Sequence, residues 1–160
     1  MRVLPQLTFT VTGIGAALML TAGIATAAGT PLTQDQAEAR LIPNGITAES
    51  PGNCTDRNNP SCVSYDGILS GTVDGVINLK KASGLDSLTV IGGTEVGHGA
   101  DGKYSHANGY KIDLRPSPAL NSYIRRTFEY VGLREDGFAL WKSGSGDLYC
   151  DERNHWDIVY

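Results

Sequence analysis

Hydrophobic and polar residues alternate with a period of two in residues 110–115 and again in residues 155–160. Such alternation is typical of β-strands that pack one face against a core. It places Asp113 on the polar face of the first predicted strand and His155 on the polar face of the second. The apolar positions of the two strands are Tyr110, Ile112, Leu114, Trp156, Ile158 and Tyr160.

Three more short apolar runs predict further strands. Residues 88–91 are rich in β-branched side chains and stop at a pair of glycines, as strands commonly do. Residues 138–141 and 147–150 flank a connection made of Lys, Ser and Gly. Two strands separated by such a connection are typical of a β-hairpin.

Three other segments predict helices. In residues 119–128 the apolar side chains fall three and four positions apart, which indicates an amphipathic helix. A second helix is expected to begin at Gln34, with Thr33 as its N-cap, and to stop before an Asn-Gly pair. A third is expected to begin with Thr72 as its cap and to end at Gly84.

The segment between the first two predicted helices contains two of the three cysteines. Residues 46–65 are rich in Asn, Pro, Ser and Gly, a composition that predicts a loop. Because so long an irregular segment needs a tether, we expect a disulfide between Cys54 and Cys62. Cys150 is then left over.

The order of these elements predicts a single small α+β domain, residues 28–160, with a mostly antiparallel sheet packed by helices. Residues 1–27 are expected to be a signal peptide, because the apolar stretch that follows Arg2 ends in a small-residue cleavage pattern. An uncleaved membrane anchor is the alternative, since the stretch approaches the length that spans a bilayer.

The charge distribution limits the kinds of molecule that the protein is expected to bind. The chain has 13 Lys and Arg against 17 Asp and Glu, a formal charge of −4, and the basic residues form no patch. This argues against a nucleic-acid partner. We expect a monomer that is secreted or periplasmic and does not stay inserted in the membrane after signal cleavage.

The chemistry concentrates on a few residues near the two alternating runs. His106, Asp113 and His155 together offer two imidazoles and a carboxylate. That set suits a catalytic zinc ion, because it leaves a fourth tetrahedral position open to water. Glu152 stands three residues before the last histidine and is the candidate general base, with Asp151 as a competitor.

The spacing His-x-x-Gly-x-x-x-Asp from His106 to Asp113, followed by Glu-x-x-His, resembles the zinc peptidases that include D-alanyl-D-alanine carboxypeptidases, D-Ala-D-Ala dipeptidases and L-alanyl-D-glutamate endopeptidases. The resemblance covers about residues 88–160. It implies the Hedgehog-like zinc fold, zinc on His106, Asp113 and His155, and Glu152 as the base. It also implies substrates among the D-amino-acid-containing peptides of peptidoglycan.

The chain departs from that family in the segment before the motif, where an arginine is expected and residues 92–98 contain none. We expect His98 to replace it as a hydrogen-bond donor to the substrate, with an ordinary surface histidine as the alternative. Lys111 and Arg115 share the face of Asp113 and are expected either to be solvated or to place a positive charge near a substrate carboxylate. Ser105 and Asn108 are expected to orient the ligands or a substrate amide.

Two other functions are compatible with the sequence. One is a binding module for cell-wall peptides that keeps the fold and the metal without hydrolysis, as the missing arginine allows. The other is a small secreted structural domain whose histidines are incidental.

Overall fold

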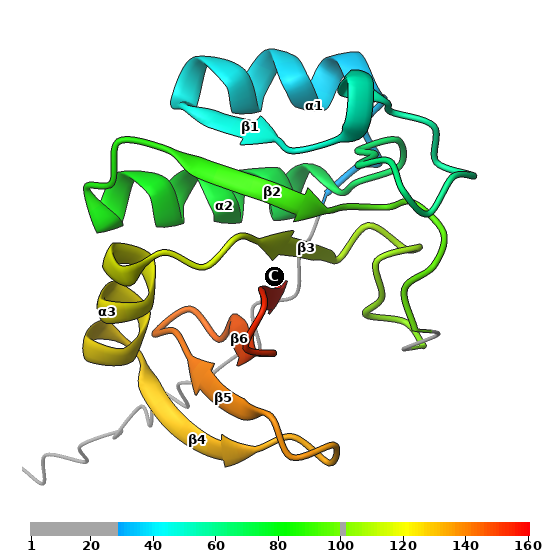
Figure 1. Ribbon diagram of the computed structural model, residues 1–160. Helices are drawn as coiled ribbons and strands as arrows, with labels where there is room; N and C mark the ends of the chain where they lie inside the picture. The colour runs from blue at the N-terminus through cyan, green and yellow to red at the C-terminus, as the bar shows by residue number, and fades with distance from the viewer. Residues whose placement is uncertain (1–28, 100–101) are drawn as a thin grey trace, which may run out of the picture.

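The computed structural model describes residues 29–99 and 102–160, and one mixed β-sheet organises them (Figure 1). Seven strands within the described ranges follow the order β1-β2-β3-β7-β6-β5-β4. Their bounds are β1 Ile46–Ala48, β2 Leu88–Gly92, β3 Lys111–Leu114, β4 Glu129–Leu133, β5 Ala139–Lys142, β6 Leu148–Asp151 and β7 Trp156–Val159. The helices in the same ranges are α1 Gln34–Leu41, α2 Ser70–Ser83 and α3 Pro118–Thr127, with short 3-10 turns at Ile42–Asn44 and Pro51–Asn53.

The strand pairing confirms the predicted α+β class. β1 and β2 are parallel, and every other neighbouring pair in the described sheet is antiparallel. The two strands predicted from the alternating pattern, β3 and β7, lie side by side, with Ile112 opposite Ile158 and Asp113 opposite Asp157. Residues of matching polarity therefore share a face of the sheet. The predicted signal peptide, residues 1–27, lies outside the described residues.

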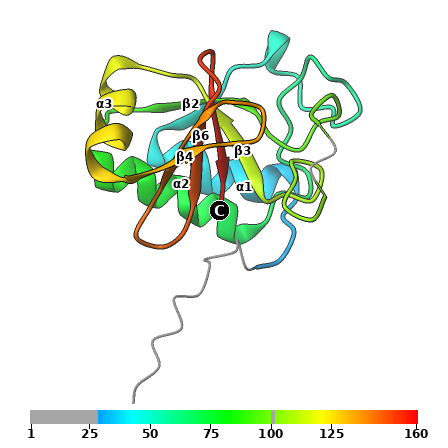
Figure 2. The same cartoon turned by 90° about the horizontal axis from the view of Figure 1, so that it is seen from below.

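The apolar face of the sheet packs on the helices. Ile112, Leu114 and Ile158 are fully buried together with apolar side chains of all three described helices. Helix α2 runs behind the strands in Figure 1, and Figure 2 shows the same layer from below. A Cβ atom at Gly75 would overlap the ring of Tyr160, so the glycine is what lets α2 approach the end of the chain this closely.

The helix predictions are confirmed in position, with one error in a cap. Thr33 caps α1 in a capping box with Gln36. Helix α2 begins at Ser70 rather than after Thr72, and its N-cap Leu69 makes no side-chain cap bond. The Thr72 cap was therefore wrong, because its hydroxyl is buried and donates instead to the carbonyl of Gly109 at 2.7 Å.

Two strands were not predicted. β1 contains three residues and lies in the segment expected to be a loop. β4 is an edge strand whose residues are mostly exposed, so it lacks the alternation that predicts a half-buried strand. Both strands are held by pairing with one neighbouring strand, β1 with β2 and β4 with β5, rather than marked by a pattern of their own.

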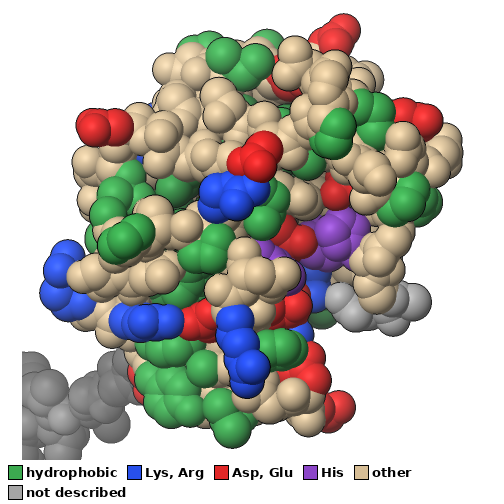
Figure 3. Space-filling view, viewed as in Figure 1, with side chains coloured by type: hydrophobic (Ala, Val, Ile, Leu, Met, Phe, Trp, Pro, Cys, Tyr) green, Lys and Arg blue, Asp and Glu red, His purple; other side chains and the backbone are tan. Residues whose placement is uncertain are grey.

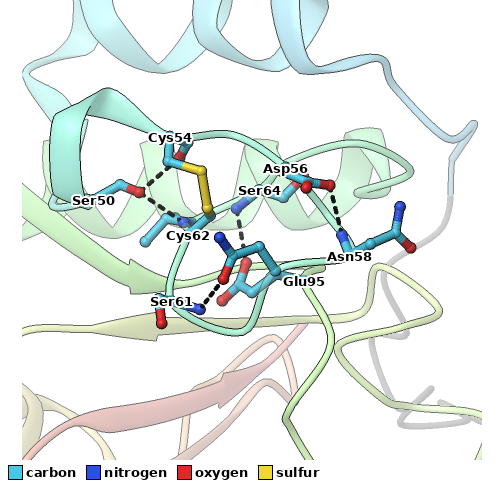
Figure 4. Close-up of a disulfide and its surroundings, with 10 residues drawn as sticks. Ser50, Cys54, Asp56, Asn58, Ser61, Cys62, Ser64 and Glu95 are labelled. Carbon is cyan, nitrogen blue, oxygen red and sulfur yellow. Dashed lines mark hydrogen bonds between the residues drawn. A yellow bond between two sulfur atoms is a disulfide. The ribbon is translucent and has the colours of Figure 1, made fainter.

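The predicted disulfide between Cys54 and Cys62 is present (Figure 4). It closes the loop between the 3-10 turn at Pro51–Asn53 and Ser64. The hydroxyl of Ser50 donates to the carbonyl of Cys54 and accepts from the amide of Val63, so hydrogen bonds reinforce the covalent closure.

Cys150 is a buried free thiol. Within the described ranges, no helix has the length and apolar character needed to cross a bilayer.

Candidate metal centre

A pocket of about 800 Å³ opens on the sheet face opposite the buried apolar side chains. The residues predicted as metal ligands, general base and substrate contact all line it, although they come from three separate parts of the chain. They are His98, His106, Asp113, Glu152 and His155. Figure 3 shows the histidine side chains in purple, next to acidic and basic side chains.

Asp113 is the centre of this group. It is buried on β3, and its Oδ1 lies 3.3 Å from Nε2 of His106 and 3.8 Å from Nε2 of His155. His155 immediately precedes β7, which pairs with β3, so the sheet places it beside Asp113. His106 returns to the same point through a tight turn, in which the amide of Gly109 donates to its carbonyl at 2.8 Å.

His98 faces the other oxygen of the same carboxylate. Its Nδ1 is 3.7 Å from Oδ2 of Asp113, and its ring stacks on that of His106 with centroids 3.8 Å apart. Ligand atoms of His98, His106 and Asp113 lie within 4.8 Å of one another, so this group could hold a metal ion. The histidine expected to contact the substrate is thus also placed to reach a metal.

Several nitrogen and oxygen atoms of the site carry free lone pairs that could bind a cation. Nδ1 of His106 lies 2.7 Å from the carbonyl oxygen of Gly93, so that nitrogen carries a proton and Nε2 of the neutral ring is bare. This Nε2 faces Oδ1 of Asp113 at 3.3 Å and Oδ1 of Asp157 at 3.8 Å. Neither oxygen accepts a hydrogen bond from any described residue, although both are buried. Such a set of lone pairs is what a metal ion satisfies.

The pKa values of His106 and Asp113 in the metal-free protein also show that this pocket attracts positive charge. Burial by itself would lower the pKa of His106, but the Asp113 carboxylate outweighs it and raises that pKa above its ordinary value. Burial would raise the pKa of Asp113, but the contact with His106, helped by His155 and His98, lowers it. The pocket therefore favours positive charge at the position between these side chains.

Glu152 is the better placed of the two candidate bases. Its Oε2 lies 3.3 Å from Nε2 of His155, and its Oε1 contacts the guanidinium of Arg134. Asp151 instead pairs with Arg125 of α3 and is not among the residues that line the pocket. Among the described residues, the geometry thus favours Glu152 over Asp151.

Arg134 is a pocket residue that sequence reasoning missed. It lies just after β4, and its guanidinium contacts Glu152, Asp136 and Asp157, the last with Nη1 at 2.9 Å from Oδ2. Lys111 reaches the same Oδ2 at 2.9 Å. No local motif marks Arg134, because two of its partners, Glu152 and Asp157, lie far from it in the sequence.

The structure also places the supporting residues that the sequence suggested. Lys111 is buried with 6% of its surface exposed, so the expectation of a solvated side chain was wrong. Its partner Asp157 neutralises the charge that burial would otherwise penalise. Arg115 pairs with Glu49 on an exposed part of the surface. Asn108 donates to the carbonyls of Gly102 and Lys103, and so holds the loop before β3.

No family model matches the chain, and neither a curated protein nor a solved structure shows significant similarity to it. The likeness to the zinc peptidases therefore stands on the residues of the site alone.

Proposed function

We propose that the chain is an exported zinc-dependent peptidase that hydrolyses peptide bonds in the D-amino-acid-containing stem peptides of peptidoglycan. One observation carries the proposal: Nε2 of His106 and Nε2 of His155 both face Oδ1 of Asp113, and a carboxylate of Glu152 lies beside His155. Two imidazoles that face one carboxylate oxygen, with an acid next to one of them, supply the groups that metal-assisted hydrolysis needs. The substrate class rests on the resemblance of the motif.

The residues of the site have different roles in the proposed reaction. His106, Asp113 and His155 would hold the zinc ion, which when bound lowers the pKa of water towards neutrality and polarises the scissile carbonyl. Glu152 accepts the proton of the attacking water and returns it to the leaving amine. Arg134 contacts the other oxygen of Glu152 and so fixes the direction in which this carboxylate points.

Export is supported by the Cys54–Cys62 disulfide, because such bonds persist in oxidising compartments. N-terminal sequencing of the secreted protein should find cleavage after Ala27 or Ala28. A mature protein that still begins at residue 1 would contradict the signal peptide and favour the anchor.

The test of the activity is hydrolysis of purified muropeptides with zinc, followed by chromatography of the products. Glu152→Gln keeps the shape of the side chain and should lower the rate by about 10²–10⁴-fold, the usual contribution of a general base. Glu129→Gln makes the same chemical change on the exposed edge strand β4 and should leave the rate unchanged. Hydrolysis by Glu152→Gln at the wild-type rate would rule out the proposed mechanism.

A second function is a zinc-containing binding module without hydrolysis, and His98 is the observation that favours it. With Nδ1 at 3.7 Å from Asp113, His98 could become a fourth protein donor. Four protein ligands are typical of a structural zinc site, which has no position open for water. Muropeptide binding in calorimetry, with no product after prolonged incubation with zinc, would establish this function instead.

A further inference from the structure

Glu95 is a buried acid to which neither proposed function gives a role. Only 4% of its surface is exposed. Its carboxylate accepts from the amide of Ser64 at 2.7 Å and from the amide of Gly93 at 3.0 Å, and it contacts Nε2 of His98 at 2.9 Å. Glu95 is therefore held in place by two backbone amides, directly behind His98.

The contact with Glu95 decides how His98 faces the metal centre. A neutral imidazole that donates from Nε2 to a carboxylate has a bare Nδ1, and this Nδ1 is the atom that faces Asp113. His106 is arranged in the same way, since it donates from Nδ1 to Gly93 and turns its bare Nε2 to Asp113. The short segment from Gly93 to Glu95 thus orients both stacked rings. Metal-ligating histidines are commonly held by such an acceptor on the second ring nitrogen.

The same segment packs on the disulfide-closed loop. Figure 4 shows Glu95 reaching the amide of Ser64, two residues after Cys62. Thr94 donates its amide to the carbonyl of Ser64 at 2.7 Å. A Cβ atom at Gly93 would overlap that carbonyl oxygen, so the two backbones lie as close as glycine allows. The position of Glu95 thus depends on this loop.

We propose that Glu95 is a positioning residue of the metal centre, which holds the ring of His98 towards Asp113 and links the centre to the loop closed by Cys54 and Cys62. The inference rests on the metal site of the proposed function and is independent of hydrolysis. It assigns His98 a role at the metal rather than at the substrate, which is the arrangement that favours the second proposed function.

The test is the zinc affinity of the purified protein, measured by competition with a chromophoric chelator at neutral pH. Glu95→Gln should weaken zinc binding by about 10–100-fold, the usual effect of losing such a partner. Glu49→Gln is the matched control, because Glu49 is exposed and pairs with Arg115 away from the pocket. Circular dichroism of the metal-free variants checks that they fold.

A double variant separates an effect through His98 from a general loss of structure. His98 is 24% exposed in its side chain, so His98→Ala should fold and show a similar loss of zinc affinity. Adding Glu95→Gln to His98→Ala should change the affinity by less than about twofold, because Glu95 acts through a ring that is already absent. Full additivity of the two losses would overturn the proposal, as would wild-type affinity in either single variant.

The outcomes also distinguish this inference from the proposed function. A wild-type protein that binds zinc but hydrolyses nothing refutes the peptidase, and the affinity pattern still supports Glu95. Wild-type affinity in Glu95→Gln refutes the role of Glu95 and leaves the peptidase intact. A wild-type protein that binds no zinc refutes both.

Discussion

Gly109 closes the turn that begins at His106 and packs on residues 67–69, which lead into helix α2, so Gly109→Ala should weaken the whole fold. Gly109 has a φ of +77°, which side chains rarely adopt. An added Cβ would overlap the carbonyl oxygen of Gly67 and lie 2.8 Å from the amide nitrogen of Leu69. Both are backbone atoms, and the amide of Leu69 already donates to Gly109 at 3.1 Å. The chain therefore cannot make room by turning a side chain.

The magnitude follows from two separate costs. A left-handed backbone costs an alanine about 1–2 kcal/mol. Forcing the two segments apart costs a further ~1–3 kcal/mol, as for other overpacked sites, so the expected loss is roughly 2–5 kcal/mol. Gly84→Ala is the matched control, because Gly84 has a φ of +66° and no atom within 4 Å of an added Cβ. Its free energy of unfolding should fall only by the cost of the left-handed backbone, about 1–2 kcal/mol.

Urea unfolding of the metal-free variants, followed by tryptophan fluorescence, measures both losses. The effect of glycine on the unfolded chain is the same in the two variants and cancels in the comparison. Gly109→Ala should therefore be less stable than Gly84→Ala. Equal free energies of unfolding in the two variants would refute the close approach of Gly109 to the backbone of Gly67 and Leu69.

Three further predictions concern the pocket and its surroundings. Arg134→Ala should lower kcat by about 10²-fold with a smaller change in KM, because displacing the general base impairs catalysis more than substrate binding. Arg126→Ala, at an exposed position of α3, is the control. An unchanged kcat in Arg134→Ala would count against the role of Arg134. Burial raises the pKa of Cys150 to about 12, so iodoacetamide should label this thiol in denaturant and not in the native protein, and rapid native labelling would contradict its placement. In metal-free protein the raised pKa of His106 means that the ion pair stabilises the fold below the ordinary histidine pKa of about 6.5 and loses this contribution as pH rises through the raised value. The difference in unfolding free energy between wild type and His106→Ala should therefore shrink as pH rises, and a difference that grows would contradict the ion pair.

The elements that the sequence predicted well have their own hydrophobic periodicity. The alternation in β3 and β7 places Ile112 and Ile158 in the core and Asp113 on the opposite face, as expected. Strands β1 and β4 have no such pattern, since one is very short and the other is exposed at the edge of the sheet. Their place in the sheet comes from pairing with a neighbouring strand rather than from a pattern of their own.

The site shows the same division between local and distant signals. His106 and Asp113 share one motif, and the polar face of the predicted strands was enough to expect Asp113 beside His155. Arg134 and Glu95 had no such signal, because each also needs a partner far away in the sequence: Arg134 meets Asp157, and Glu95 meets the amide of Ser64. Charged residues in glycine-rich or turn segments are usually solvated, so only the folded chain shows that Glu95 is buried.

The metal content of the purified protein tests the central claim most directly. After dialysis with zinc and removal of the free ion, elemental analysis should find about one zinc per chain in the wild type. Asp113→Ala removes the carboxylate that faces the three histidines and should retain almost none. A wild-type protein without zinc, or Asp113→Ala with the wild-type content, would contradict a metal centre at this pocket.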